Sequence, residues 1–598
     1  MPTADLNTTA PPPLLGVRQS LRGWRWQMAP VLEREAAGLA QSYQLPDLVG
    51  RLLAARGVTL DSAEAFLTPR LKHALPDAMA FQDMRALVAR LARAVAAREA
   101  VVLFGDYDVD GATSAALLHS YLAHLGLNTR IHIPDRLTEG YGPSEAAMRA
   151  FAEAGVTLVV TLDCGTAAHA PLEAARAAGL DVLVIDHHKA PAALPPAVAV
   201  VNPNRLDEAG HGRDLAAVGV TFLTAVALNR YLAETGRMAR DALPDLLFYL
   251  DLVALGTVCD LVPLTGANRA FVAQGLKVMG RRGRPGLRAL ADRAGVDRAP
   301  DVYHLGFLLG PRINAGGRIG DAGLGARLLT TVDDDEARTI AGTLDRLNQE
   351  RRALEAEILD QAIDQAERAS GEGVVFTHGD HWHPGVLGIV AGRLKERYGR
   401  PAVVLSGYDQ AGQAVGSARS IGGVDIGAAV IDAAAAGLLV KGGGHAMAAG
   451  MTVEAGGLAA LQAFLDQRLG AAIAAAREDA ALVLDGLITV AGATPALIAA
   501  IDRIGPFGMG NPAPRFAVPE ARVVKADRVG SDHVRLIVTG PAGGRLKAMA
   551  FRAAETALGA ALLAGSGRRF HLAGRLKHDA WGGADRAELH VEDAAAAD

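Results

Sequence analysis

Short, uninterrupted apolar runs recur along the first half of the chain. They cover residues 101–104, 158–162 and 182–185, and a Gly, Asp or His follows each one. Runs without polar alternation are typical of strands that are buried on both faces of a parallel sheet. Between the first two runs, apolar positions from 113 to 125 recur with helical spacing. Alternating strands and helices predict a doubly wound α/β domain, with helices on both faces of its sheet.

A fourth apolar run covers residues 252–259 and ends at Asp260. We expect it to behave like the other three, so that four apolar segments each carry an Asp or His at the carboxyl end. In open α/β sheets, ligands bind at the carboxyl ends of the strands. If the four segments are neighbours in one sheet, these polar side chains converge.

The second half of the chain has a different pattern. Four acidic residues at 333–336 precede a polar, periodic stretch without proline that runs to about residue 367. Carboxylates suit a helix N-terminus, so this stretch predicts one long helix that connects two domains. A second α/β region follows, and it begins with an apolar run at 374–376. From about residue 480, alternating strand patterns at 522–525, 534–538 and 570–573 predict a small β-barrel that resembles an OB-fold.

These patterns predict five segments along the chain. The first is an N-terminal extension, residues 1–45, which packs, if at all, through Trp24 and Trp26. The others are the first α/β domain, the connecting helix, the second α/β domain and the barrel, at residues 46–330, 331–370, 371–475 and 476–598.

Composition excludes several classes of protein. The chain has 598 residues, of which 50% are hydrophobic and 21% charged, which argues against a disordered protein. The only cysteines are Cys164 and Cys259, too few for a disulfide framework or a zinc ribbon. No run of about 18 apolar residues occurs, and the N-terminus lacks the order of a secretory signal. We therefore expect a reduced, cytoplasmic protein without a transmembrane helix.

Positive charge is concentrated in one region. The formal net charge of the chain is −5, whereas residues 501–580 carry thirteen Lys/Arg and six Asp/Glu, a net of +7. A basic patch on a small barrel favours a polyanion as its ligand. The alternative is a basic surface without a ligand.

The strongest chemical signal is a group of three carboxylates directly after the first apolar run. Asp106, Asp108 and Asp110 stand at alternate positions between Gly105 and Gly111. Such close negative charges remain ionised together most easily beside a cation. A solvated acidic turn is the alternative. The other runs end in Asp163, in Asp186-His187-His188 and in Asp260.

Carboxylates with one or two imidazoles favour Mn²⁺ or Mg²⁺ over zinc. Two such ions about 3.5–4 Å apart form a clamp for phosphoester hydrolysis, in which one activates water and the other stabilises an oxygen. Cys164 and Cys259 lie beside expected ligands. If strand geometry persists there, their side chains point away from the carboxylates, and we interpret both as small buried apolar residues.

These motifs together resemble the DHH phosphoesterase superfamily. They are GDYDVDG, LDCG, DHHK and GTVCDLVPL in the first domain, and KGGGHAMAAG, typical of the DHHA1 partner domain, at residues 441–450. Their order and spacing resemble the RecJ family of single-stranded-DNA exonucleases from about residue 45 to the C-terminus. The stretch IPDRLTEGYG at residues 133–142 resembles that family too.

The resemblance implies roles for individual residues. The implied metal ligands are Asp108, Asp110, Asp163, His187 and Asp260, with Asp163 as the bridge between two ions. Asp106, Asp186 and His188 are implied as close catalytic supports, with His188 near the scissile phosphate. Some members carry a further histidine ligand two residues before the first motif aspartate, where this chain has Phe104. The first metal is then expected to be held less tightly, or its site to be completed by water or Asp106.

Several residues outside the metal motifs suit a phosphate or a base. The Gly443-Gly444-His445 loop offers backbone N–H groups without obstruction, although a glycine-rich turn need not bind phosphate. Ser417 and Arg419 on one strand face, together with Arg312 and Asn314, are candidates for binding a terminal 5′-phosphate. Arg136 and Tyr141 are candidates for the next nucleotides. For Tyr141, ordinary packing is the alternative.

The resemblance implies a 5′→3′ exonuclease that degrades single-stranded DNA to mononucleotides in DNA repair and recombination. It also implies a helicase and a single-strand-binding protein as partners. We further expect a monomer that does not associate with a membrane. A second hypothesis is a phosphodiesterase of the same superfamily acting on short oligonucleotides or dinucleotides, which would not need a basic barrel. A third is a scaffold without activity, which would not need so many buried carboxylates.

Overall fold

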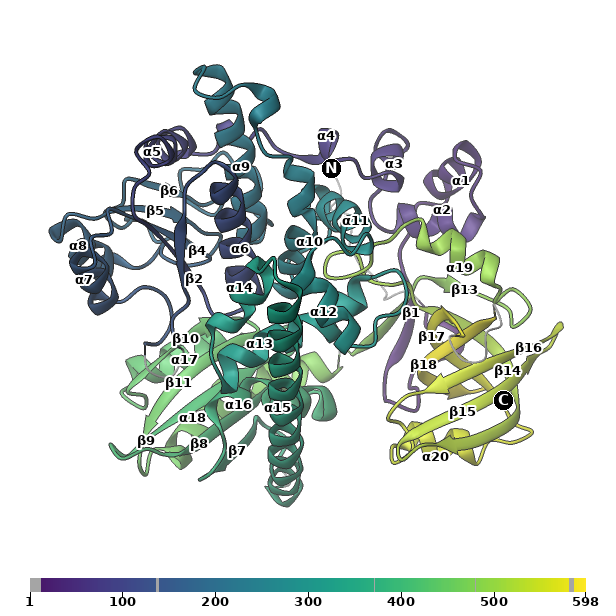
Figure 1. The fold of residues 1–598 in the computed structure, drawn as a ribbon. Coiled ribbons are helices and arrows are strands. Elements are labelled where there is room, and N and C mark those ends of the chain that lie inside the picture. Colours follow the sequence, from purple (N-terminus) through teal and green to yellow (C-terminus); the bar gives the residue numbers. More distant parts are fainter. Residues whose placement is uncertain (1–11, 136–138, 370, 479, 580–585, 598) are drawn as a thin grey trace, which may run out of the picture. The chain divides into compact units, whose positions relative to one another are not determined.

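The chain forms two compact units in a computed structural model that describes residues 12–135, 139–369, 371–478, 480–579 and 586–597 (Figure 1). One unit comprises Ala74–Glu478. The other combines both ends of the chain, Met1–His73 and Asp479–Asp598. We describe each unit by itself.

The larger unit begins with a five-stranded parallel sheet. The strand order is β3-β2-β4-β5-β6. The strands are β2 Val101–Gly105, β3 Thr129–His132, β4 Leu158–Leu162, β5 Asp181–Ile185 and β6 Ala199–Val201. Every residue of β2 and β4 is buried, as the uninterrupted apolar runs predict.

Helices cover both faces of this sheet, which confirms the predicted doubly wound fold (Figure 1). On one face lie α5 Met84–Ala97, α6 Val109–His124 and α9 Ala217–Glu234. On the other lie α7 Glu145–Glu153 and α8 His169–Ala177. Alternate strand residues such as Val102 and Phe104 pack against the second pair of helices.

The fourth apolar run is a helix, so the expectation of a strand there is wrong. It forms α10, Leu250–Cys259, which is buried from Leu250 to Val258 and packs against α6, α9 and α11, Gly266–Gly280. A helix buried on all sides has no polar face, so its sequence shows the same continuous apolar run as a buried strand. Among the described residues, Arg240–Cys259 is long and apolar enough to cross a membrane by length and composition alone, but most of this stretch is buried inside the unit.

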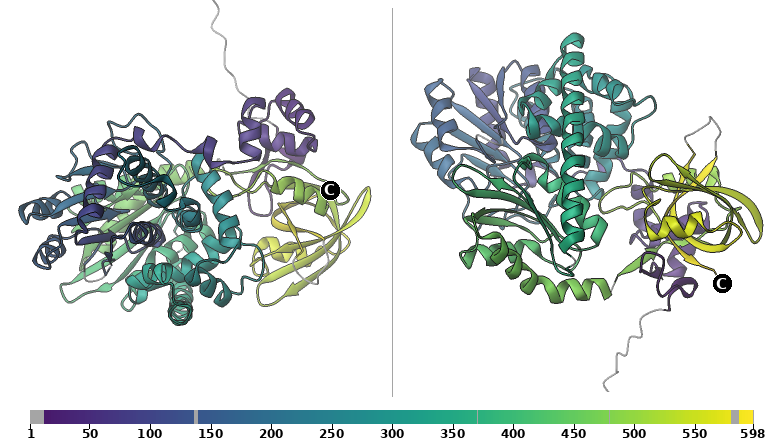
Figure 2. Two further views of the ribbon diagram at one scale, coloured as in Figure 1. Left: turned by 45° about the horizontal axis from the view of Figure 1, so that its top comes forward. Right: turned by 90° about the horizontal axis from the view of Figure 1, so that it is seen from below.

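After α11 the chain forms a helical layer that ends in the long connecting helix. Its elements are α12 Pro285–Arg293, a π-helix η5 at His304–Leu309, α13 Gly310–Ile319, α14 Gly323–Thr330 and α15 Asp334–Ala369. As predicted, carboxylates begin α15: Asp333 Oδ1 accepts hydrogen bonds from the backbone N–H groups of Asp335 (2.7 Å) and Glu336 (2.9 Å). The right view of Figure 2 shows α15 from the side, as one unbroken helix.

The second α/β region of this unit is a mixed five-stranded sheet with three helices. Its strand order is β10-β11-β9-β8-β7, and only β7 and β8 are parallel. The strands are β7 Val375–Gly379, β8 Ala402–Tyr408, β9 Gln413–Arg419, β10 Lys441–His445 and β11 Ala448–Glu454. The helices are α16 Pro384–Tyr398, α17 Ile426–Ala435 and α18 Leu458–Glu478. Ile358 and Ala362 of α15 join the apolar core beneath α16.

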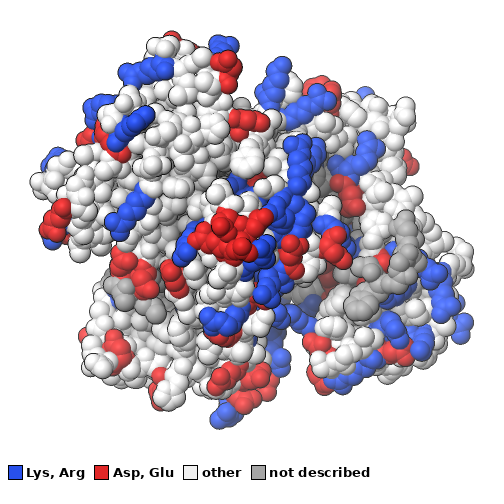
Figure 3. Space-filling view, viewed as in Figure 1, with Lys and Arg blue, Asp and Glu red and all other residues white. Residues whose placement is uncertain are grey.

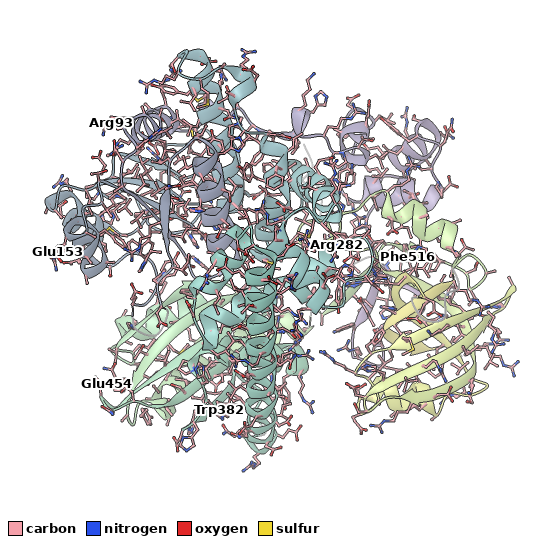
Figure 4. All side chains as sticks on the ribbon, in the orientation of Figure 1. Arg93, Glu153, Arg282, Trp382, Glu454 and Phe516 are labelled. Atoms are coloured by element: carbon pink, nitrogen blue, oxygen red, sulfur yellow. The ribbon has the colours of Figure 1, made fainter. Side chains whose placement is uncertain are left out.

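The smaller unit is built around a closed barrel, as predicted. Its strands run in the order β14-β15-β16-β18-β17, and pairing between β14 and β17 closes it. They are β14 Phe516–Val529, β15 His533–Gly540, β16 Gly543–Ala550, β17 Arg569–His578 and β18 Ala587–Ala596, with α19 Pro495–Asp502 and α20 Ala557–Leu563 beside them. Phe516, which Figure 4 labels at the start of β14, is fully buried in the barrel core.

The N-terminal residues up to His73 belong to this unit. The expected first α/β domain began at residue 46, so residues 46–73 lie in a different unit from the rest of that domain. The segments are β1 Arg25–Met28, α1 Glu33–Ser42, α2 Asp47–Ala54 and α3 Leu60–Leu67. Val49, Leu52 and Leu53 of α2 lie in the barrel core, and β1 pairs with β12, Ala481–Leu484. Apolar periodicity shows that a helix has an apolar face, but it does not show which distant segment covers that face.

Trp26 anchors the N-terminal strand in this unit. The side chain is fully buried, and Nε1 donates a 2.8 Å hydrogen bond to Asp593 Oδ2. Replacing Trp26 with alanine is therefore expected to lower the stability of the smaller unit by about 3–5 kcal/mol. Chemical denaturation followed by circular dichroism measures this, with Trp24→Ala as the control because Trp24 is only partly buried. Equal stability losses in the two variants would contradict the anchoring role.

Candidate metal centre

Carboxylates and imidazoles from four elements meet at the carboxyl edge of the parallel sheet. The chain delivers them directly after β2, β4 and β5 and at the end of α10. Three groups of side chains have ligand atoms within 4.8 Å of one another: Asp106, Asp108 and Asp163; Asp163, His187 and His188; and Asp110, His187 and Asp260. The convergence expected from four chain segments is therefore present, although the fourth is a helix.

The N-terminus of α6 orients two of the carboxylates. Asp108 is the N-cap, and its Oδ1 accepts hydrogen bonds from the backbone N–H groups of Asp110 (2.9 Å) and Gly111 (3.1 Å). Asp110 accepts from Ala217 N (2.6 Å) and Val218 N (2.9 Å) at the start of α9. These contacts fix both carboxylates without a side-chain cation, so their negative charge stays available to a metal ion.

A glycine makes this close arrangement possible. A Cβ atom on Gly111 would lie 2.4 Å from the backbone oxygen of Asp106. No larger residue fits there, because the first turn of α6 packs directly against the preceding loop.

Three buried ligand atoms face one another without a hydrogen-bond partner in the described part of the chain. They are Asp163 Oδ1, His187 Nε2 and Asp260 Oδ2. His187 Nε2 lies 3.2 Å from Asp163 Oδ1, 3.6 Å from Asp260 Oδ2 and 3.9 Å from Asp110 Oδ2. Buried polar atoms without a partner destabilise a fold unless something else satisfies them, and a cation at this point would satisfy all three.

Asp186 organises the two histidines. Its Oδ1 accepts hydrogen bonds from the backbone N–H groups of His187 (2.7 Å) and His188 (3.1 Å), and it lies 2.8 Å from His188 Nδ1. Its Oδ2 accepts from Thr166 N (3.0 Å). Asp186 therefore holds the histidine loop in place.

The two imidazoles differ in their pKa values. Burial and the positive charge of His188 lower the pKa of His187 to about 4, so the His187 imidazole is neutral at pH 7. Burial alone would lower the pKa of His188, but the hydrogen bond and charge of Asp186 raise it to about 9. His188 is 43% exposed and faces solvent as a cation, which suits a phosphate.

The carboxylates repel one another. Burial and the charge of Asp108 raise the pKa of Asp110 to about 7, and burial with the charge of Asp110 raises the pKa of Asp260 to about 9. Burial and the charge of Asp110 also raise the pKa of Asp163 well above its ordinary value. A cluster of this kind needs a compensating positive charge. Its oxygen-rich composition, with one neutral imidazole, fits Mn²⁺ or Mg²⁺ better than zinc.

Neither cysteine belongs to the three ligand groups found among the described residues. Burial raises the pKa of both thiols. Phe104 is also fully buried, with its ring 6.4 Å from Phe151 and 5.2 Å from His132. The side chain that stands in place of a histidine ligand is therefore part of the apolar layer under α7.

Tyr141 and α13 lie close to the carboxylate and histidine cluster. The Tyr141 hydroxyl is 3.5 Å from the carbonyl oxygen of Asp163, and its ring centroid is 6.1 Å from that of His188. A Cβ atom on Gly317 of α13 would lie 2.8 Å from the backbone oxygen of Tyr107, so α13 packs on the first motif. This places the helix that carries Arg312 and Asn314 beside the site. Arg136 lies outside the described residues.

Arg312 already has protein partners. Its Nε donates to Asp345 Oδ1 of α15 (2.9 Å), and its Nη1 donates to the carbonyl oxygen of Leu308 (2.7 Å). The sequence did not indicate this ion pair, because it joins two helices that are separated by 33 positions. A guanidinium has five N–H donors, so Arg312 can still bind a further anion.

Ser417 and Arg419 share one face of β9, as predicted. A Cβ atom on Gly388 of α16 would lie 2.8 Å from Arg419 Nη2 and 3.6 Å from Ser417 Oγ, so both side chains point toward the same helix. Gly443, Gly444 and His445 do not form the expected loop. They belong to β10, an edge strand that pairs with β11. The small residues fit a hairpin here, and the outer edge of β10 still presents backbone N–H groups.

Sequence reasoning missed three polar residues that support the histidine loop. Asn202 Nδ2 donates to the carbonyl oxygen of His188 (2.8 Å) and to Thr166 Oγ1 (2.9 Å), and Asn204 Nδ2 donates to the carbonyl oxygen of His187. Asn202 directly follows β6, and Asn204 lies two residues further on. The signal was available, because Asn-Pro-Asn at 202–204 follows a fifth short apolar run at 197–201.

Comparison with known proteins agrees with this architecture. The family model described as the DHH family, N-terminal domain, matches residues 100–257, the DHHA1 domain matches 371–471, and the RecJ OB domain matches 484–593. The chain is 33% identical to the single-stranded-DNA-specific exonuclease RecJ of Bacillus subtilis, over 96% of this chain and 71% of that protein. It is 36% identical to the RecJ of Dickeya dadantii, over 84% and 88%.

Solved structures lead to the same family. The crystal structure of Thermus thermophilus RecJ in complex with Mn²⁺ has a TM-score of 0.79 at 29% identity and covers 96% of this chain and 80% of that one. The corresponding complex with Mg²⁺ has a TM-score of 0.73 at 27% identity, with coverage of 96% and 78%. Together with the carboxylate and histidine cluster at the carboxyl edge of the sheet, these matches show that the chain belongs to the RecJ family of single-stranded-DNA-specific exonucleases.

Proposed function

We propose that this protein is a metal-dependent exonuclease that degrades single-stranded DNA from its 5′ end to mononucleotides, in DNA repair and recombination. The observation that carries the proposal is the convergence of Asp163 Oδ1, His187 Nε2 and Asp260 Oδ2, buried and without a hydrogen-bond partner among the described residues. In a RecJ-family chain, such a cluster is best explained as a site for catalytic cations.

Five residues would hold two ions of Mn²⁺ or Mg²⁺. They are Asp108, Asp110, Asp163, His187 and Asp260, and Asp163 would serve both ions because it belongs to two of the three ligand groups. When bound, divalent cations supply an activated water and stabilise the charge that develops on the phosphate oxygens. Asp106 lies in the same group as Asp108 and Asp163, so it would complete the site where Phe104 offers no ligand.

The remaining residues position the substrate. Asp186 holds His188 by its Nδ1, which leaves Nε2 of the cationic ring for a phosphate oxygen near the scissile bond. Tyr141 is 57% exposed beside His188, and its ring would stack on a base. Arg136, Arg312 and Asn314 would bind phosphates of the same strand. The edge strand at Gly443, Gly444 and His445 would contact a phosphate through backbone N–H groups and the imidazole.

The 5′ polarity would come from Ser417 and Arg419, which would bind the terminal phosphate. We expect Arg419→Ala to lower kcat/KM on a 5′-phosphorylated single strand about ten-fold or more, since a hydrogen bond to a charged group is lost. Steady-state kinetics on strands with a 5′-phosphate and with a 5′-hydroxyl measures this. The loss should shrink on the 5′-hydroxyl strand, and Arg397→Ala, an exposed arginine of α16 that pairs with Glu367, should behave like the wild type on both. Equal losses on both strands would remove Arg419 from phosphate recognition.

The basic barrel would hold a further part of the strand by its backbone, because an OB-fold with local positive charge suits single-stranded DNA. We further propose that the protein acts as a monomer in the cytoplasm. A helicase that supplies single strands and a single-strand-binding protein would be its partners.

A substrate panel tests this function. The protein is incubated with Mn²⁺ and, in parallel, a 5′-phosphorylated DNA strand, the matched duplex, the matched RNA and a dinucleotide, beside EDTA and Asp108→Ala controls. Mononucleotide release from the DNA strand, with little from the duplex and none in either control, supports the proposal. Hydrolysis of the dinucleotide without degradation of the long strand would instead identify a phosphodiesterase of small substrates.

A further inference from the structure

An arginine-lined pocket lies in the larger unit, away from the metal ligands. It has a volume of about 550 Å³ and is formed by the end of α11, by α12, by the following loop at 296–300 and by Leu309. Small-molecule sites typically have about 300–1,000 Å³, so the pocket is large enough for a ligand of nucleotide size. We call it the α12 pocket.

The α12 pocket is separated from the metal centre by the length of α10. Asp251, near the start of α10, lines the pocket, whereas Asp260, at the end of the same helix, faces His187. Nine residues of α-helix span about 13 Å. A ligand in the α12 pocket would therefore not occupy the metal centre.

Three kinds of side chain line this pocket: arginines, apolar residues and the carboxylates of Asp251, Asp292 and Asp297. Four guanidinium groups contribute positive charge: those of Arg282, Arg284, Arg288 and Arg298. The apolar part of the wall consists of Met279, Leu287, Val296, Pro300 and Leu309. Guanidinium forks suit phosphate oxygens, and an apolar wall suits the face of a base. A nucleotide combines both features in one molecule.

One arginine is built rigidly into the wall. Arg284 is 6% exposed and binds Asp251 through Nε (2.9 Å) and Nη2 (3.1 Å). Its guanidinium also lies 5.0 Å from the centroid of the Phe248 ring. Because Arg284 is buried and held by Asp251, this pair shapes the pocket and leaves the recognition of an anion to the more exposed arginines.

The other arginines are better placed for a ligand. Arg282 pairs with Asp292, and Arg288 pairs with Asp334 and donates through Nη1 to the carbonyl oxygen of Arg282 (3.1 Å). Both side chains are about one-third exposed, so their remaining N–H donors can reach a ligand. Arg298 is exposed and forms no hydrogen bond or ion pair within the part of the chain that the structure describes. It therefore offers a full guanidinium at the rim of the pocket.

The surroundings add to the positive potential. Residues 277–298 contain seven Lys/Arg and two Asp, a net of +5 in a chain whose total is −5. Figure 3 shows a band of basic side chains over the part of the surface where Figure 1 draws α11 and α12, and Figure 4 labels Arg282 there. Such a field attracts anions toward the pocket.

We propose that the α12 pocket is a nucleotide-binding site, with the phosphate held by Arg282, Arg288 and Arg298 and the base against Leu287 and Val296. Its ligand is a nucleotide, either free or as one unit of a bound strand. Both sources present the same phosphate and base, and the experiment separates them.

Calorimetric titration of the full-length protein in EDTA with dTMP tests the proposal. We expect one site that binds dTMP, and that binds thymidine and inorganic phosphate at least about ten-fold more weakly, because each lacks half of the recognised groups. Arg282→Ala and Arg298→Ala should each weaken dTMP binding about ten-fold or more. Arg281→Ala is the matched control, since Arg281 is exposed, adjacent in sequence and outside the pocket lining.

Two further variants keep the result unambiguous. Ala291→Phe would fill the α12 pocket without changing its charge and should abolish binding, while thermal melting verifies that each variant is folded. If dTMP binding disappears in Arg419→Ala and persists in the pocket variants, the nucleotide occupies the proposed 5′-phosphate site and the inference is wrong. Absence of binding, or equal affinity for inorganic phosphate and dTMP, also overturns it.

Competition identifies the source of the nucleotide. A single-stranded oligothymidylate that displaces dTMP from the wild type shows that the pocket takes a unit of the bound strand. If dTMP stays bound beside the oligonucleotide, the pocket takes a free nucleotide. Both outcomes support a nucleotide site, and neither depends on whether the metal centre cleaves DNA.

Discussion

Replacing Asp163 with asparagine is expected to lower the exonuclease rate about 10³-fold or more, while single-strand binding persists. The carboxylate is 2% exposed and belongs to two of the three ligand groups, so its loss affects both proposed cation positions. The substituted side chain would still fit the backbone, since Asp163 has φ 62° and asparagine tolerates that left-handed conformation. Single-turnover kinetics with Mn²⁺ and a binding assay in EDTA measure the two quantities.

Asp241→Asn serves as the control for this substitution. Asp241 is exposed and lies outside the ligand groups found in the described part of the chain. The control variant should keep wild-type rates. An Asp163→Asn protein that cleaves DNA within a few-fold of the wild type would exclude a shared ligand at this position.

The same substitution is expected to stabilise the metal-free protein. In EDTA, Asp163 is a buried carboxyl group surrounded by Asp106, Asp108, Asp110 and Asp260, and the cationic ring of His188 offsets only part of their repulsion. Removing one charge should raise Tm by about 2 °C or more. With saturating Mn²⁺, the wild type should instead have the higher Tm. An ion at about 100 times its Kd adds about 2.7 kcal/mol to the stability of the wild type alone. Differential scanning calorimetry with and without Mn²⁺ measures both effects.

The difference in stability between Asp163→Asn and the wild type in EDTA should increase with pH. The folded-state pKa values of Asp110 and Asp260 are raised, to about 7 and about 9, so the folded protein binds more protons than the unfolded chain. The metal-free wild type therefore loses stability as pH rises through that range. The advantage of Asp163→Asn in EDTA should be larger at about pH 8 than at about pH 5. A wild type that is more stable than the variant in EDTA at both values would contradict a cluster that needs cations.

Much of the site could be predicted because most of its polar residues directly follow strands that the sequence itself indicates. Asp106, Asp108 and Asp110 directly follow a strand, and the rule that ligands bind at carboxyl edges places Asp163 and His187 nearby. Asp260 was predicted correctly to join them, but for a wrong reason, because it ends a helix. A continuous apolar run shows full burial and does not distinguish a strand from a helix.

The parts that could not be predicted depend on long-range contacts. The ion pair between Arg312 and Asp345, and the packing of α2 in the barrel core, join segments whose separate patterns contain no sign of the partner. The glycine-rich segment at 443–445 illustrates a different problem. Glycine is rare in strands, so the composition favoured a loop, whereas pairing with β11 makes it an edge strand.

One measurement tests the central claim most directly. A 5′-phosphorylated DNA strand carries a different label at each end and is incubated with the wild type and Mn²⁺, and the products are followed over time. The account predicts that the 5′ label appears first as a mononucleotide, while the 3′ label remains on a strand that shortens gradually, and that EDTA or Asp163→Asn stops both. Early release of the 3′ label, internal cleavage or degradation that persists in EDTA would contradict a metal-dependent 5′→3′ exonuclease.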